Sequence, residues 1–387
     1  MSDLTLVGLF ASLALAVALY ALSLPQGGAS WWGLAALSVA LVLAGRAAGP
    51  SWGGAICLDA AELAAVAMVW TQGTGDTLRA AHRYLGAIAP AIVCTLAAQA
   101  LVGEGAAAPA PPVDKLAVCL LLVGFALKLG LIPFYFWLPA VAAAAPPMTT
   151  ALIVSIVDIA TFAELLELRQ AAPWVFTEHA AIWMGIALLS LCGGALLALA
   201  QRELKRMLAF STIADLGLLL TGVVAGGPVG LAGAQIGAVS HALSKVILFG
   251  AVGLAERRIA QPVTLDTRGL AARLPFAGAA FVIGALGFIG VPPGLGFVGY
   301  WRLYVAGADY GGPALLAALF LVAALDLLCY VRAIHRVWLG PPQVAVSGAP
   351  AALAQATMTV LAVGIILLGL YPEMFTTAVG FAVAVVR

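Results

Sequence analysis

The chain has four lysines and fourteen arginines, and two of those lysines, Lys128 and Lys245, lie deep inside apolar runs long enough to cross a membrane. Arginine stays charged wherever it lies, whereas a desolvated lysine can release its proton. Lys128 lies about thirteen residues into its run, too far for its ammonium to reach the membrane surface easily at about 1.5 Å per residue. These buried lysines indicate proton transfer inside a membrane.

Two further pairs of ionisable residues have helical spacing. His241 and Lys245 are four residues apart, hence on one face of a helix, and Glu62 follows Asp59 by three residues. Ionisable groups inside a membrane bundle are expected to serve transport, although His241 and Lys245 could instead form a structural hydrogen bond between helices. We expect Glu62 to be buried and Asp59 to lie close to the membrane interface.

Three aspartates, Asp158, Asp215 and Asp326, also lie inside apolar runs. Each is a candidate member of a proton relay, and each could simply pair with a neighbouring helix. The charges that close the run around Asp158 are predicted to form an interfacial cluster: Glu164, Glu167 and Arg169.

Residues for other kinds of chemistry are missing from the sequence. It contains no nucleotide-binding motif, no nucleophile with a neighbouring base and no CxxC pair, and its five cysteines all lie in apolar runs. We therefore expect no cofactor and no metal on this chain. A net charge of +1 argues against a nucleic-acid partner. These exclusions favour the movement of protons or other ions.

The elements that position these residues are predicted to be membrane-spanning helices. Hydrophobic residues make up 64% of the chain and charged residues 9%, against about 25% charged in soluble domains. The runs are continuously apolar, unlike the alternating strands of a membrane barrel. We treat the first run as a retained span, because no basic region precedes it. We expect an all-α, polytopic helix bundle in the lipid bilayer with about twelve spans, near residues 4–24, 31–48, 54–72, 84–103, 115–136, 147–168, 180–200, 207–226, 231–254, 275–306, 312–331 and 353–371.

Two of these spans are interrupted by prolines. Pro133 breaks one span, and Pro292 with Pro293 breaks another, because proline donates no backbone hydrogen bond and clashes with the preceding turn. Interrupted helices at corresponding places in two halves indicate an ion site near the middle of the membrane. We predict one transmembrane domain, 1–387, made of two inverted five-helix repeats, 31–168 and 180–336, and a C-terminal span and tail, 353–387.

Basic residues are divided unevenly between the predicted loops. Eleven, including Arg83, follow the spans at 54–72, 180–200, 231–254 and 312–331, whereas four, including Arg302, lie on the opposite side. Basic loops stay in the cytoplasm. We therefore predict a multi-pass protein of the inner (cytoplasmic) membrane with its N-terminus outside.

Several ordered motifs resemble the signatures of one known family, the antiporter-like subunits of respiratory complex I. Energy-converting hydrogenases and multisubunit sodium/proton antiporters use the same fold. The resemblance covers about residues 55–375 and includes Tyr371-Pro372. The motifs are KLGLIPFYFWLP at 128–139, APPMTTAL at 145–152, LKRMLAFSTIADLG at 204–217, SHALSKVILF at 240–249 and GVPPGLGF at 290–297.

The resemblance implies roles for individual residues. In that family a glutamate of an early span pairs with the lysine of the first broken helix, and Glu62 and Lys128 match these positions. Arg83 matches a basic position that follows, and His241 and Lys245 match the central relay of the second half. The family implies proton uptake through one half-channel and release through another, joined by a charged axis along the membrane midplane.

Three positions differ from the family pattern. The family usually has histidine where Tyr135 stands, often has lysine or histidine near Asp158, and commonly has lysine or glutamate in place of Tyr300. A phenol releases its proton only near about pH 10, so Tyr300 is a poor relay. Arg302 stays protonated and can gate only by its charge. We expect Asp326 to supply the missing acid.

Together these features predict a proton-translocating, antiporter-like subunit of a complex-I-related complex, such as a NADH/quinone oxidoreductase or an energy-converting hydrogenase. We expect Lys128 to be the central switch and Glu62 to tune it, because a nearby carboxylate favours the protonated lysine and burial disfavours it. Redox energy is expected to come from partner membrane subunits. Two alternatives stay open: a cation/proton antiporter or ion-coupled uptake module, for protons or sodium, and a non-pumping membrane scaffold.

Overall fold

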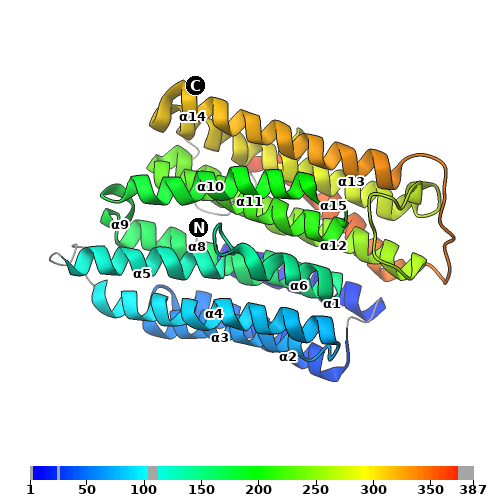
Figure 1. Cartoon of the computed structure of the whole chain (residues 1–387), viewed down its shortest axis with the longest axis horizontal. Helices are drawn as coiled ribbons and strands as arrows, with labels where there is room; N and C mark the ends of the chain where they lie inside the picture. The colour runs from blue at the N-terminus through cyan, green and yellow to red at the C-terminus, as the bar shows by residue number, and fades with distance from the viewer. Residues whose placement is uncertain (1–2, 24–26, 103–111, 374–387) are drawn as a thin grey trace.

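The computed structural model describes residues 3–23, 27–102 and 112–373 (Figure 1). Within these ranges the regular structure is helical, apart from one isolated backbone bridge between Glu203 and Thr264. Among the described residues, eight helices are long and apolar enough to cross a membrane, and shorter apolar helices accompany them. The predicted all-α transmembrane bundle is therefore confirmed, whereas the number of crossings and the division into inverted repeats stay predictions.

The elements of the first half lie together along one side of the bundle in Figure 1. Short 3₁₀ (η1) and π-helical (η2) segments join some of the α-helices. In chain order the elements are α1 (Asp3–Ser23), α2 (Ala29–Ala48), α3 (Trp52–Trp70), α4 (Gly75–Val102), α5 (Val113–Lys128), η1 (Tyr135–Trp137), α6 (Leu138–Ala144), α7 (Pro147–Leu152), η2 (Ile153–Val157) and α8 (Asp158–Ala171).

The second half packs against the first and ends in the last described helix. Part of the predicted C-terminal tail, 374–387, lies outside the described residues. The elements are α9 (Trp174–Thr177), α10 (Ala180–Ala200), α11 (Leu204–Ala225), α12 (Gly227–Ile259), η3 (Leu270–Ala272), α13 (Pro275–Ile289), α14 (Leu295–Ala333), η4 (Ile334–Trp338) and α15 (Ala352–Leu370).

Both predicted helix interruptions are present. The segment with Pro133 separates α5 from η1 and α6, and the segment with Pro292 and Pro293 separates α13 from α14. Non-helical backbone at membrane depth is tolerated where protein surrounds it and satisfies its polar groups. The side chains next to each break therefore matter to the fold as well as to any transport.

Side chains from other helices bond the backbone groups near the two breaks. At the first break, the backbone N–H of Ile132 donates to the hydroxyl of Ser190 on α10, at 3.0 Å. At the second, the hydroxyl of Ser240 on α12 donates to the carbonyl oxygen of Gly287, at 3.2 Å. The first break is thus attached to a helix of the second half.

Helix α14 is two antiparallel arms and not one straight rod. The rings of Tyr304 and Phe320 lie 4.9 Å apart, whereas sixteen residues of straight helix would separate them by about 24 Å. The chain reverses at Gly312, which precedes Pro313. The φ of Gly312 is 64°, a left-handed conformation that favours glycine. This reversal agrees with the predicted boundary between the spans at 275–306 and 312–331.

Loops predicted to share one side of the membrane gather at one end of the bundle, on the right in Figure 1. The backbone N–H of Leu204 donates to the carbonyl of Val263 at 3.0 Å, and that of Gln343 donates to Arg268 at 3.3 Å. The loops after α10, α12 and α14 are joined in this way. Which end faces the cytoplasm stays a prediction.

Helices α11 and α12 form the centre of the second half. Their most apolar stretches are 100% and 94% buried inside this chain. Small residues allow the close approach: a Cβ added to Gly194 of α10 would lie 2.5 Å from the backbone nitrogen of Ala214 on α11. The polar residues of α11 and α12 are therefore shielded from lipid by neighbouring helices.

Candidate proton-transfer sites

Lys128 lies at the last turn of α5, directly before the first break, and is almost completely buried. Its ammonium contacts the carboxylate of Asp59 on α3. It also lies 3.6 Å from Glu62 Oε1 and 3.9 Å from Glu164 Oε2. One lysine thus shares its surroundings with three acids from two other helices, and we call these four residues the acidic cluster.

The structure corrects the predicted positions of two of these acids. Asp59 was expected near the membrane interface, but it is buried and is the nearest partner of Lys128. Glu164 was expected in an interfacial cluster with Glu167 and Arg169, yet its carboxylate reaches Lys128. The three-residue spacing of Asp59 and Glu62 was the signal, because it puts both side chains on the face that carries the predicted partner of Lys128.

Other polar side chains extend the acidic cluster. Thr161 of α8 donates a hydrogen bond to Glu62 Oε1 at 2.8 Å. Asp158, also on α8, is buried and lies close enough to Glu62 to interact with it electrostatically. Its Oδ2 has no hydrogen-bond partner among the described residues. Asp158 follows the π-helical segment η2, a geometry frequent at functional sites.

A second buried group contains Asp215 and Ser211 of α11 with His241 and Lys245 of α12. The Nδ1 atom of His241 lies 2.6 Å from Asp215 Oδ2, and both side chains are buried. The ammonium of Lys245 donates to Ser211 Oγ at 2.7 Å and to the carbonyl of Leu208 at 2.8 Å. The predicted His241 and Lys245 pair is thus placed against the preceding helix.

A small cavity of about 20 Å³ lies beside this second group. Asp215, Tyr300 and Asp326 all line it. Asp326 Oδ1 has no hydrogen-bond partner among the described residues. A polar cavity of this size holds about one water molecule, which would satisfy such a group. The structure therefore places Asp326 next to the position where Tyr300 replaces an expected charge.

Two predicted candidates lie away from both buried groups. Arg83 is exposed near the start of α4. Arg302 is partly buried, and its guanidinium donates at 2.7 Å to the carbonyl of Val298 on its own helix. Neither arginine makes a salt bridge with a carboxylate in the part of the chain that the structure describes.

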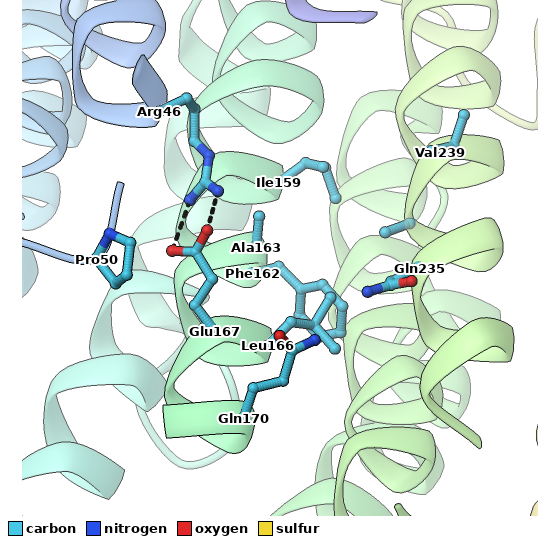
Figure 2. Close-up of a pocket in the computed structure, with 11 residues that line it drawn as sticks. Arg46, Pro50, Ile159, Phe162, Ala163, Leu166, Glu167, Gln170, Gln235 and Val239 are labelled. Atoms are coloured by element: carbon cyan, nitrogen blue, oxygen red, sulfur yellow. Dashed lines mark hydrogen bonds and ion pairs between the residues drawn. The ribbon is translucent and has the colours of Figure 1, made fainter. Parts of the chain in front are cut away.

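A buried ion pair between Arg46 of α2 and Glu167 of α8 was not predicted from the sequence. The two side chains meet through both terminal guanidinium nitrogens and both carboxylate oxygens (Figure 2), and the contact from Nη1 to Oε2 measures 3.0 Å. Arg46 is almost completely buried, although it lies in the last turn of its helix. Glu167 therefore has its ion-pair partner on α2.

The chemistry available to these groups is proton transfer. No set of three or more His, Cys, Asp or Glu side chains that could hold a metal ion is found within the described ranges. Both buried groups combine bases and acids within or near hydrogen-bonding distance, next to an interrupted helix. Interrupted helices in two halves of a bundle, with ionisable residues buried beside them, define a membrane protein of the ion-transporter class.

Comparison with known proteins gives the family within this class. The chain belongs to the NADH:quinone oxidoreductase/Mrp antiporter transmembrane family, whose model matches residues 97–325. NADH-quinone oxidoreductase subunit N 3 of Streptomyces griseus is 31% identical over 261 residues, which are 66% of this chain and 47% of that protein. Subunit N 1 of Sorangium cellulosum is 34% identical over 301 residues, 73% and 58% of the two chains. This chain spans about half the length of the curated relatives it matches.

Solved structures share the fold over nearly the whole chain. A chain of respiratory complex I from Thermus thermophilus, solved with bound aureothin, has a TM-score of 0.81 and 26% identity, covering 97% of this chain and 86% of the other. A chain of the Mrp complex from a Dietzia species has a TM-score of 0.86 and 21% identity, covering 95% and 80%. The likeness to the Mrp chain shows the fold alone.

Proposed function

We propose that this chain is a proton-translocating, antiporter-like subunit of a complex-I-related complex in the bacterial inner membrane. The observation that supports it most strongly is the acidic cluster, in which a buried lysine beside a helix break lies within 4 Å of three acids. A single ion pair needs one acid for one base, and this lysine has three acids within 4 Å. Several acids around one lysine instead offer alternative positions for a moving proton.

In this proposal Lys128 is the switch of the first half. A proton moves between its amine and the carboxylates of Asp59, Glu62 and Glu164, which lie within or near hydrogen-bonding distance. Asp158, which interacts electrostatically with Glu62, extends the path along α8. A small movement of the break at Pro133 would change which acid Lys128 meets.

The second half supplies a second transfer group. Asp215 and His241 exchange a proton directly, since their side chains are 2.6 Å apart. A water in the cavity between Asp215, Tyr300 and Asp326 would carry it on to Asp326. The proposal therefore assigns the exit to Asp326 and gives Tyr300 at most a hydrogen-bonding part.

In this proposal, partner subunits carry out the electron transfer and supply its energy to this chain. The chain is expected to bind no cofactor, and the relatives are named as subunits of NADH-quinone oxidoreductases. Transport of sodium in place of protons is the second candidate, since the chain belongs to a family that includes the Mrp antiporters. A flux that needs a sodium gradient and no redox partner would favour it.

The substitution Lys128→Ala in the assembled complex is the central test. It removes the switch, so we expect the proton-to-electron ratio to fall, and Lys128→Arg should not restore it, because arginine stays protonated. The matched control is Lys115→Ala, which changes an exposed lysine of the same helix. A normal ratio in assembled Lys128→Ala would refute the role and favour the scaffold alternative.

The orientation can be tested separately by cysteine labelling. The uneven distribution of basic residues predicts that the loop at 256–273 is cytoplasmic and that the N-terminus is outside. Cysteines introduced in that loop should react with a membrane-impermeant reagent in inverted vesicles only. Labelling of the same loop from outside intact cells would reverse the predicted orientation.

A further inference from the structure

Lys205, the lysine of the LKRMLAFSTIADLG motif, is a third buried lysine that the proposed proton path does not use. It lies in the first turn of α11, at the end of the bundle where the basic loops gather, and its side chain is only 8% exposed. A buried charge is retained where other groups of the protein compensate it. The partners of Lys205 therefore indicate what it does.

The C-terminal end of α6 lacks backbone hydrogen-bond donors. In an α-helix the carbonyl of residue i accepts from the N–H of residue i+4, so the carbonyl of Ala143 would need a donor at Pro147. Proline has no N–H, and Pro146 lacks one as well. The N–H of Ala145 still donates to the carbonyl of Val141, at 2.8 Å. The carbonyls that follow need a donor from elsewhere.

Lys205 supplies this donor from the second half of the molecule. Its ammonium donates to the carbonyl of Ala143 at 3.1 Å and to that of Ala145 at 3.5 Å. A helix C-terminus carries partial negative charge, which favours a cation there. Glu256 Oε2 of α12 lies 3.4 Å from the same ammonium, and Glu256 Oε1 accepts from the N–H of Val263 at 3.2 Å. Lys205 thus joins the end of α6 to both α11 and α12.

Ser190 attaches the other end of the same interrupted segment. The N–H of Ile132, in the break that follows Lys128, donates to the hydroxyl of Ser190, which is fully buried on α10. Between the two attachments the indole of Trp137 donates to the carbonyl of Leu127 at 2.9 Å, which bonds the two pieces of the span to each other. The second half therefore holds the broken span at both ends of its interruption.

We propose that Lys205 and Ser190 are positioning residues, through which the second half of the molecule fixes the broken span of the first half and so places the ammonium of Lys128 among its three acids. This rests on the proposed function of Lys128. Groups that react with one another must be held to within about 0.5 Å by the residues around them. Lys205 and Ser190 act only through hydrogen bonds to the backbone of the broken span, and neither exchanges a proton with the acidic cluster.

A role in membrane orientation alone would not require these contacts. The positive-inside rule counts basic residues in loops, whichever groups they contact. Arg206, the next residue, carries the same charge at the same end of the bundle, but its side chain is 51% exposed and pairs with Glu203 in its own turn, at 3.2 Å. Lys205 reaches the broken span and Arg206 does not, so Arg206 is the matched control.

Lys205→Met in the assembled complex is the test. It removes the donor to the end of α6, so we expect the proton-to-electron ratio per assembled complex to fall at least about twofold, because a small misplacement of reacting groups slows transfer steeply. Arg206→Met should keep the parent ratio. A purely structural role would lower the amount of complex and leave the ratio of the assembled fraction unchanged.

Lys205→Arg separates positioning from proton exchange. Arginine can donate to the same carbonyls but stays protonated, so Lys205→Arg should keep the parent ratio, in contrast to Lys128→Arg. Hydrogen exchange of a peptide that covers α6 gives a second measurement. Exchange there should be at least about tenfold faster in Lys205→Met, because the helix end opens locally, and unchanged in Lys205→Arg and Arg206→Met.

Ser190→Ala keeps the test decisive if Lys205→Met does not assemble. It removes one hydroxyl, the acceptor for the N–H of Ile132, and should also lower the proton-to-electron ratio. In that case a parent ratio in Ser190→Ala overturns the proposal.

The remaining outcomes separate the positioning role from the proposed function. If Lys128→Ala abolishes pumping and assembled Lys205→Met pumps at the parent ratio, the positioning role is wrong and the function of Lys128 stands. Loss of pumping in Lys205→Arg with unchanged exchange in α6 also overturns positioning, since Lys205 would then take part in proton exchange itself. If Lys128→Ala pumps normally, both proposals fall.

Discussion

The two buried lysines of this chain have opposite surroundings. Lys128 lies among three carboxylates, from Asp59, Glu62 and Glu164. Lys245 has no carboxylate within 4 Å among the described residues, and its ammonium is held by the Ser211 hydroxyl, the carbonyl of Leu208 and the face of the Phe288 ring, whose centroid is 3.9 Å away.

This difference separates two ways of keeping an ionisable group inside a membrane. In the acidic cluster the lysine lies within 4 Å of three acids, so a proton has several acceptors close by. Around Lys245 the partners are neutral, and the acid, Asp215, is bonded to His241. The surroundings of Lys128 suit a residue that changes its proton-transfer partner. The surroundings of Lys245 suit a residue that keeps one position, between His241 and the small cavity.

The largest contrast is expected when each lysine becomes methionine. Lys128→Met leaves three buried acids without their cation, and should destabilise the protein by about 3–5 kcal/mol, the usual effect of breaking a buried ion pair. Lys245→Met leaves only neutral acceptors unpaired, and should cost about 1–3 kcal/mol. Unfolding of the purified subunit in detergent measures both values. Equal losses would show that the two surroundings do not differ in the way the contacts suggest.

A smaller effect is expected at the exit of the second half. Asp326→Asn removes the acid from the cavity shared with Asp215 and Tyr300, so the proton-to-electron ratio should fall while the complex still assembles. Tyr300→Phe is the matched control in the same cavity and should change the ratio little. Normal pumping by Asp326→Asn, together with failure of Lys128→Ala, would place the exit elsewhere and leave the acidic cluster as the active half.

The smallest effect concerns the ring under Lys245. Phe288→Leu removes a cation–π contact worth about 0.5–2 kcal/mol. Phe281→Leu is the control, because Phe281 is also buried and packs against Tyr330 but contacts no lysine. A double-mutant cycle with Lys245→Met isolates the contact. If the coupling energy is zero, the ring only fills space.

The helices and both breaks could be predicted from the sequence, because long apolar runs and prolines act locally. The positions of Lys128 and Glu62 could be predicted too, with help from the resemblance to a known family. Asp59 and Glu164 were misplaced because distance from a predicted span end measures depth only. It does not show which neighbour covers a side chain, and α5 brings Lys128 to both acids.

The pair of Arg46 and Glu167 could not be predicted for a related reason. Each residue lies close to the end of its helix, where a single sequence indicates an exposed, solvated charge. Their burial depends on contact between α2 and α8, which are distant in the chain (Figure 2). Only tertiary structure carries that information.

The turn between α11 and α12 has a consequence for how the chain enters the membrane during synthesis. Inserting a lysine at the centre of a single helix costs about 2.5–3.5 kcal/mol. Lys245 and His241 have their partners, Ser211 and Asp215, on the immediately preceding helix, and only the turn around Gly226 lies between. The two helices can therefore leave the translocon as one hairpin with these bonds already formed. Lys128 has its partners on α3, which is synthesised before it, and on α8, which is synthesised after it. Neither is its hairpin partner, so its insertion depends on helices synthesised at different times.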